Sequence, residues 1–174
     1  MARSQRRKVH LIMALLGLIT LCGAARADNE IAVIVAQDTP EFRLNITILR
    51  DIYLKKIFIN EHDQEFIPLN LPPEHVLRRA FSLALFNKGA QELQNYWNQR
   101  YFHGITPPYV LASPQAVVQF VAKTPGAIGY VPPCDLDPRV KQVLSLPVPP
   151  SEQEAVEKLC SSHAAAAADS ITSE

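Results

Sequence analysis

The segment from Phe66 to Phe86 constrains the fold more than any other part of the sequence. It reads as a short buried strand, Phe66 to Leu71, a proline turn, and an amphipathic helix from about Glu74. A strand that leads directly into a helix is where α/β proteins bind anions, because the free N–H groups of the first helical turn face the crevice there. This segment therefore predicts an α/β fold, and the proline turn within it is the place where an anion would bind.

The first 27 residues read as a secretory signal peptide. Basic residues come first, an apolar run from Leu11 to Cys22 follows, and Ala25-Arg26-Ala27 forms a small-residue cleavage motif. The apolar run has about 12 residues, whereas a membrane-spanning helix needs roughly 20. We expect cleavage before Asp28 and export to the periplasm, with no membrane insertion afterwards; an uncleaved anchor is the alternative.

Removal of this leader changes the charge of the chain. The leader carries five of the 17 basic residues and none of the 17 acidic ones, so residues 28–174 hold 12 basic against 17 acidic residues, a net charge of −5. Nucleic-acid-binding proteins need a clustered basic face, and anionic membranes attract basic segments. The charge therefore argues against both partners, and the length fits one domain over 28–150 with a helix or disordered tail over 151–174.

Cys134 and Cys160 are the two cysteines outside the leader. In an oxidising compartment an even pair reads first as a disulfide, which would tie down the C-terminal segment. Two free buried thiols are the alternative.

The order of expected elements predicts the fold class. Ile31 to Ala36 is a continuous apolar run, which is typical of a buried central strand. Further helices follow Asn45, Gly89 and Ser113, and strands are expected over Ala127 to Val131 and Val143 to Val148. This order predicts a three-layer α/β domain with a mainly parallel sheet flanked by helices.

Motifs of known enzymes and cofactor sites are missing from the sequence. The acidic loop from Glu61 to Glu65 reads as a solvated turn, because neighbouring side chains on a loop seldom converge on one metal ion. A nucleophile pair of Cys134 and His75 is a minor alternative. We expect a protein that is not an enzyme and binds no cofactor or metal.

Several segments resemble the phosphate-type substrate-binding proteins of ABC transporters, in the type 2 periplasmic binding protein superfamily. The most specific is Thr124-Pro125-Gly126-Ala127-Ile128-Gly129-Tyr130-Val131. Supporting segments are Ile52-Tyr53-Leu54 before Lys55-Lys56, and Tyr96-Trp97 followed by Phe102, Gly104 and Pro107-Pro108. The resemblance spans about Ile31 to Val131 and implies one lobe of such a protein, export, and a phosphate-like small anion as the ligand.

The sequence also departs from this family. Members have two lobes, and their anion-binding turn is rich in serine and glycine, whereas Pro72 and Pro73 lack N–H groups and Glu74 brings a negative charge. Lys55 stands where the family has glycine. The candidate ligand-binding residues are Thr39, Asn70, Arg78 and Arg79. The alternatives are that both arginines are solvated, and that the chain is an interaction or sensor-accessory domain for an envelope membrane protein.

Overall fold

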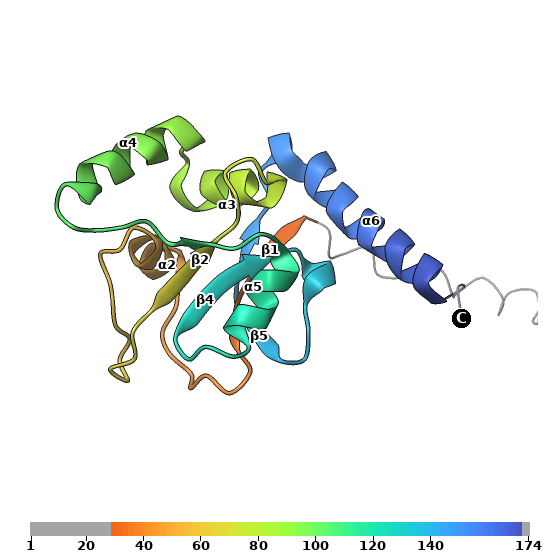
Figure 1. Ribbon diagram of the computed structural model, residues 1–174, viewed down its shortest axis with the longest axis horizontal. Helices are drawn as coiled ribbons and strands as arrows, with labels where there is room; N and C mark the ends of the chain where they lie inside the picture. Colours follow the sequence, from red (N-terminus) through yellow and green to blue (C-terminus); the bar gives the residue numbers. More distant parts are fainter. Residues whose placement is uncertain (1–28, 172–174) are drawn as a thin grey trace, which may run out of the picture.

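The computed structural model describes residues 29–171, with side chains to Ser162. The expected signal peptide and its cleavage site lie outside these residues, so both stay predictions. The strands are β1 (Glu30–Ala36), β2 (Ile67–Asn70), β3 (Tyr109–Val110), β4 (Ala127–Val131) and β5 (Val140–Pro147). The helices are α2 (Ile46–Tyr53), α3 (Val76–Phe86), α4 (Ala90–Tyr101), α5 (Pro114–Val121) and α6 (Gln153–Ile171), with short 3-10 turns η1 (Pro133–Asp135) and η2 (Pro150–Glu152) (Figure 1).

The five strands form one sheet in the order β3-β2-β4-β1-β5. β2 pairs in parallel with β3 and β4, whereas β1 pairs antiparallel with both β4 and β5. Four strands therefore run in one direction and β1 runs against them. The predicted mainly parallel sheet is confirmed, and the reversal of β1 was not foreseen.

Helices cover both faces of this sheet, as successive residues of β4 show. A Cβ at Gly129 would overlap Val117 of α5, so α5 packs directly against the strand where a side chain is lacking. The next residue, Tyr130, points to the other face and stacks on Phe81 of α3, with ring centroids 3.8 Å apart. These two contacts place α5 on one face and α3 on the other, which confirms the predicted three layers.

Local capping explains where the helices begin. The Asn45 side chain accepts hydrogen bonds from the Thr47 and Ile48 N–H groups at 2.9 and 3.0 Å at the start of α2. α3 begins at Val76, two residues later than expected, because the Nδ1 atom of His75 caps it by accepting from the Leu77 N–H at 3.2 Å. Toward the end of the described residues, η2 begins at Pro150 and α6 runs from Gln153 to Ile171.

Two further features concern single residues. Lys55, at the position expected to be glycine, adopts a left-handed conformation with φ of 52°. Cys134 of η1 and Cys160 of α6 are joined by a disulfide with a Cα–Cα distance of 5.6 Å. α6 is also anchored through Val156, which is fully buried.

Two buried tyrosine hydroxyls lie where β2 and β4 stop pairing. The ladder between these strands joins only Ile67 and Pro68 to β4. Beyond it, the Tyr53 hydroxyl donates to the Ile128 carbonyl oxygen at 3.2 Å. The Tyr130 hydroxyl donates to Asn70 Oδ1 and accepts from the Leu71 N–H, both at 3.2 Å. Side chains thus satisfy backbone groups that the ladder leaves unpaired.

These two phenols make the fold sensitive to alkaline pH. Burial raises the pKa of both, and the charge of Arg78 partly opposes the rise. The folded chain keeps these protons above pH 10, where tyrosines of the unfolded chain lose theirs. The stability that the two protonated phenols contribute is therefore present below pH 10 and is lost as the pH rises above it. We expect the free energy of unfolding, measured with urea from pH 8 to 11, to fall above pH 10 by about 1.4 kcal/mol per pH unit for each tyrosine.

Substitution of Tyr130 isolates its share of this effect. Tyr130→Phe should flatten the alkaline slope and should also lower stability at pH 7 by about 2 kcal/mol, because Leu71 and Asn70 lose a buried partner. Tyr109→Phe is the control, since Tyr109 is 67% exposed. An unchanged slope in Tyr130→Phe would contradict this account.

Candidate functional site

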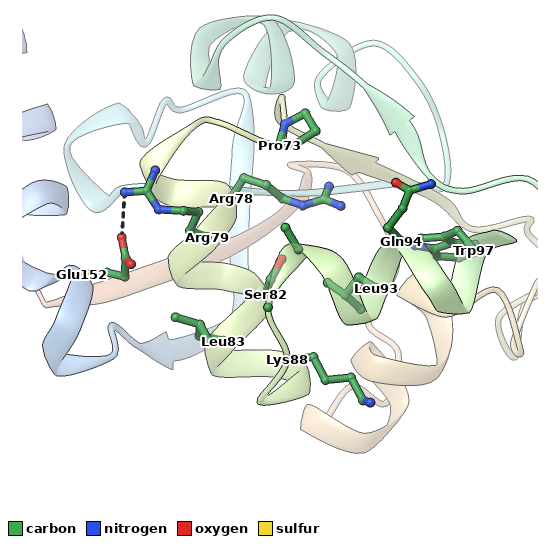
Figure 2. A pocket seen from close by; sticks show the side chains of 12 residues that line it. Pro73, Arg78, Arg79, Ser82, Leu83, Lys88, Leu93, Gln94, Trp97 and Glu152 are labelled. Carbon is green, nitrogen blue, oxygen red and sulfur yellow. Dashed lines mark hydrogen bonds and ion pairs between the residues drawn. The ribbon is translucent and has the colours of Figure 1, made fainter.

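A cavity of about 180 Å³ opens between α3 and α4, beside η2 (Figure 2). A short connection positions its two walls. Asn87 ends α3 in the left-handed conformation with φ of 53°, and α4 begins immediately after Gly89. The Glu92 side chain accepts from the Gly89 N–H at 3.3 Å and fixes the first turn of α4. The two helices therefore follow each other through a short connection, and residues of both line the cavity.

Arg78 is the side chain that gives this cavity its chemical character. Its guanidinium reaches across from α3 toward Gln94 and Trp97 of α4 (Figure 2). The Nη1 atom is buried and has no hydrogen-bond partner among the described residues. A buried charged donor without a partner is unfavourable, and native proteins usually supply an acceptor. The geometry is therefore suited to an anion that accepts from Nη1.

Arg79 lies on the opposite side of the same helical turn. Its Nη2 atom forms an ion pair with Glu152 of η2 at 3.1 Å, and Nη1 donates to the Glu74 carbonyl oxygen at 3.1 Å. Figure 2 shows the two arginines diverging from α3. Arg79 therefore lines the edge of the cavity, and the Glu152 carboxylate compensates its charge.

The remaining walls are mostly apolar. Ser82 contributes a hydroxyl from the buried side of α3, and Lys88 lies at the rim, where its Nζ atom pairs with Glu92 at 3.4 Å. Trp97 is 9% exposed and meets Tyr96 edge to face, with centroids 4.9 Å apart. Arg79 and Lys88 thus have carboxylate partners, and the uncompensated charge among the described lining residues is that of Arg78. The apolar lining residues are Pro73, Leu83, Ala90, Leu93 and Trp97.

The turn before α3 is not built as an anion site. The His75 N–H donates to the Pro72 carbonyl oxygen at 3.0 Å, and the Leu77 N–H is used by the His75 cap. Burial, followed by the charge of Arg79, lowers the pKa of His75, while Glu74 and Asp135 oppose this shift. The lowered pKa favours the neutral imidazole that the cap requires. The His75 and Leu77 N–H groups at this corner are therefore engaged within the chain.

The structure does not bring the four candidate residues together. Arg78 and Arg79 line the cavity. Asn70 is 5% exposed and holds the Tyr130 hydroxyl instead. Thr39 follows the reversed strand β1, whose last residue pairs with Val140, so it lies at the end of the sheet opposite to Asn70. The structure thus separates Thr39 from Asn70, because β1 runs against the other strands.

Sequence reasoning missed four polar lining residues: Ser82, Lys88, Gln94 and Glu152. Only Ser82 carried a signal, since it is a polar residue beside Phe81 on the buried side of an amphipathic helix. Trp97 carries a different signal: Leu93, Trp97 and Tyr101 are spaced i, i+4 and i+8, which predicts core packing of the Trp97 side chain. The structure buries this side chain and also places it at the cavity.

Neither metal-binding clusters nor membrane spans are found in the part of the chain that the structure describes. No group of three or more His, Cys, Asp or Glu side chains within residues 29–162 could hold a metal ion. Over the same residues, no helix combines the length and apolar character needed to cross a bilayer.

Comparisons with known proteins give a likeness of fold. No family model and no curated protein sequence matches the chain. Among solved structures, a phosphate ABC transporter substrate-binding protein with bound phosphate from Clostridium perfringens is similar, with a TM-score of 0.54 and 16% identity over 76% of this chain. An ABC-type phosphate transport receptor from Vibrio cholerae is similar with a TM-score of 0.54 and 15% identity over 76% of this chain. The chain spans just under two thirds of each, 63% and 65%. At such low identity, the structural likeness shows a shared fold alone.

Proposed function

We propose that this chain is an exported, non-enzymatic protein that binds a small anion between α3 and α4 through Arg78. The observation that carries the proposal is the buried Nη1 atom of Arg78, which has no partner among the described residues and faces a cavity. The fold shared with phosphate-binding receptors supports a solute-binding role.

Binding at this place does not depend on a second lobe. The cavity is lined by residues of α3, α4, η2 and the turns beside them. Those elements all lie within residues 29–171, so the described part of the chain supplies these walls by itself. A small anion would gain charge-assisted hydrogen bonds from Arg78 that solvent supplies poorly at a buried atom.

Export is supported by two independent features. The first 27 residues have the pattern of a cleavable signal peptide. The Cys134–Cys160 disulfide requires an oxidising compartment such as the periplasm. Pulse-labelling of the chain in cells should show a precursor that is shortened on export, with Asp28 as the new first residue.

Arg78 should determine anion affinity. We expect calorimetry with inorganic phosphate, sulfate and small carboxylates to detect binding of at least one anion at millimolar concentration. Arg78→Gln should weaken that binding by about 10-fold to 100-fold, because one charge-assisted hydrogen bond contributes roughly 1.5–3 kcal/mol. Arg79→Gln is the matched control, since its guanidinium is occupied by Glu152, and it should change affinity less than about threefold.

Two results would contradict the proposal. The first is the absence of binding for every anion tested. The second is an Arg78→Gln variant that folds, binds the same anion and has unchanged affinity.

A second candidate function, an interaction domain for an envelope membrane protein, is favoured by exposed apolar side chains. Phe102, directly after α4, is 87% exposed, and Tyr109 of the edge strand β3 is 67% exposed. Edge strands with exposed apolar residues can pair with another chain. A stoichiometric membrane partner retained by the wild-type chain and lost with Phe102→Ser or Tyr109→Ser would support this function.

A further inference from the structure

The lining of the α3–α4 cavity indicates which class of anion it accepts. We infer that the ligand is a small organic monocarboxylate with an apolar body, and that inorganic phosphate is a poorer ligand. The inference rests on the proposed function, because it assumes that Arg78 binds an anion in this cavity.

The cavity has too few polar side chains to satisfy an inorganic anion such as phosphate. Within the cavity Arg78 is the cation without a carboxylate partner among the described residues, and Ser82 and Gln94 are the neutral polar side chains on its walls. Phosphate carries charge on several oxygens that point in different directions, and each needs a donor when it leaves water. A carboxylate has two oxygens in one plane, and one guanidinium can satisfy both with parallel hydrogen bonds.

The apolar walls require an apolar ligand body. Leu83 of α3 and Leu93 and Trp97 of α4 all line the cavity. In Figure 2, Leu93 lies between the Arg78 guanidinium and Lys88, so carbon surface separates the two positive groups. A ligand whose carboxylate meets Arg78 would lay its hydrocarbon part against this surface, where each buried CH₂ strengthens binding about fourfold.

The size of the cavity limits that body. Its volume is about 180 Å³, below the roughly 300–1,000 Å³ of pockets that hold drug-sized ligands. An engineered apolar cavity of roughly 150 Å³ in another protein holds benzene. The body that fits is therefore a short chain or a single ring, and the Trp97 indole offers a face or edge for contact with a ring.

The chain carries its own reporter for the test. Trp97 is the single tryptophan of the sequence and lines the cavity. We propose titrating the full chain with acetate, butanoate, hexanoate, hexanamide and inorganic phosphate, following Trp97 emission and, in parallel, the heat of binding. Affinity should rise about fourfold per CH₂ from acetate to hexanoate until the cavity is filled. Hexanoate should bind at least about 10-fold more tightly than hexanamide, which lacks the charge, and more tightly than phosphate.

Two variants separate the charge from the apolar contact. Arg78→Gln should remove the preference for hexanoate over hexanamide. Leu83→Asn should reduce the gain per CH₂ and retain the preference for the carboxylate. Leu83 is only partly buried, so this variant keeps the core residues of α3. Far-ultraviolet circular dichroism and the urea midpoint check that each variant is folded.

Each outcome supports or overturns a particular step. Chain-length dependence together with Arg78 dependence supports the inference. If phosphate binds more tightly than hexanoate, and the binding depends on Arg78, the inference is wrong while the proposed function stands. If no anion binds by either measurement, both are wrong. If the carboxylates bind equally well to Arg78→Gln, Arg78 is not the anion-binding group and both are again wrong.

Discussion

Replacement of Gly126 by alanine is expected to lower the free energy of unfolding by about 3–5 kcal/mol. Gly126 has a φ of 81°, and a Cβ built on it would overlap the backbone carbonyl oxygen of Glu65. The Gly126 carbonyl oxygen also accepts from the Ile67 N–H at 2.9 Å, which aligns the start of β2 with β4. Any shift that relieves the overlap therefore disturbs the pairing of two central strands. Urea unfolding at neutral pH measures the loss.

Gly104 is the matched control for this substitution. It also has a positive φ, 74°, but a Cβ there would meet nothing within 4 Å. Gly104→Ala should therefore lower the free energy of unfolding by only about 1 kcal/mol, the cost of the backbone conformation. Equal effects of the two substitutions would show that backbone conformation, and not the overlap with Glu65, accounts for the requirement.

The disulfide gives the second large effect. We expect the double variant Cys134→Ser, Cys160→Ser to be less stable by about 3–4 kcal/mol, because the bond closes a loop of 26 residues and restricts the unfolded chain. The same loss should follow when the wild-type chain is reduced before urea unfolding. Hydrogen exchange should show the amides of α6 losing protection first, since the bond joins that helix to η1.

A matched measurement tests whether the bond acts on the unfolded state. If the loss comes from chain entropy, the folded double variant should keep the anion affinity of the wild-type chain. A loss of stability below about 1 kcal/mol would contradict the chain-entropy account for this bond.

Much of the fold followed from local patterns. The strand, proline turn and helix within Phe66–Phe86 were predicted with boundaries close to those of β2 and α3. The apolar run Ile31–Ala36 predicted a buried strand, and β1 is buried from Ile31 onward. These elements could be predicted because hydrophobic periodicity and capping act within a few residues.

The direction of β1 could not be read from its residues. A continuous apolar run is the same in both directions, so it indicates burial on both faces and leaves the orientation open. That orientation depends on the antiparallel pairing with β5, from the other end of the chain. β3 was missed because Tyr109 and Val110 are only two residues and both are exposed.

The candidate site was only partly predictable for a related reason. The sequence shows Arg78 as an arginine off the apolar stripe of its helix, and such residues are usually solvated. In the structure its Nη1 atom is buried and the side chain lines a cavity together with residues of α4. The sequence does not show where α4 lies relative to α3. Thr39 lies at the other end of the sheet from Asn70, because β1 runs against β2 and β4.

The position of β1 has a consequence for the way the chain reaches its native state. Ile31 pairs with Leu146, so the strand nearest the start of the described chain is joined to a strand that emerges after β2, β3 and β4 during synthesis or translocation. Until β5 arrives, one edge of an almost wholly apolar strand has no neighbour. Docking of β5 is then the late step at which productive folding competes with intermolecular association.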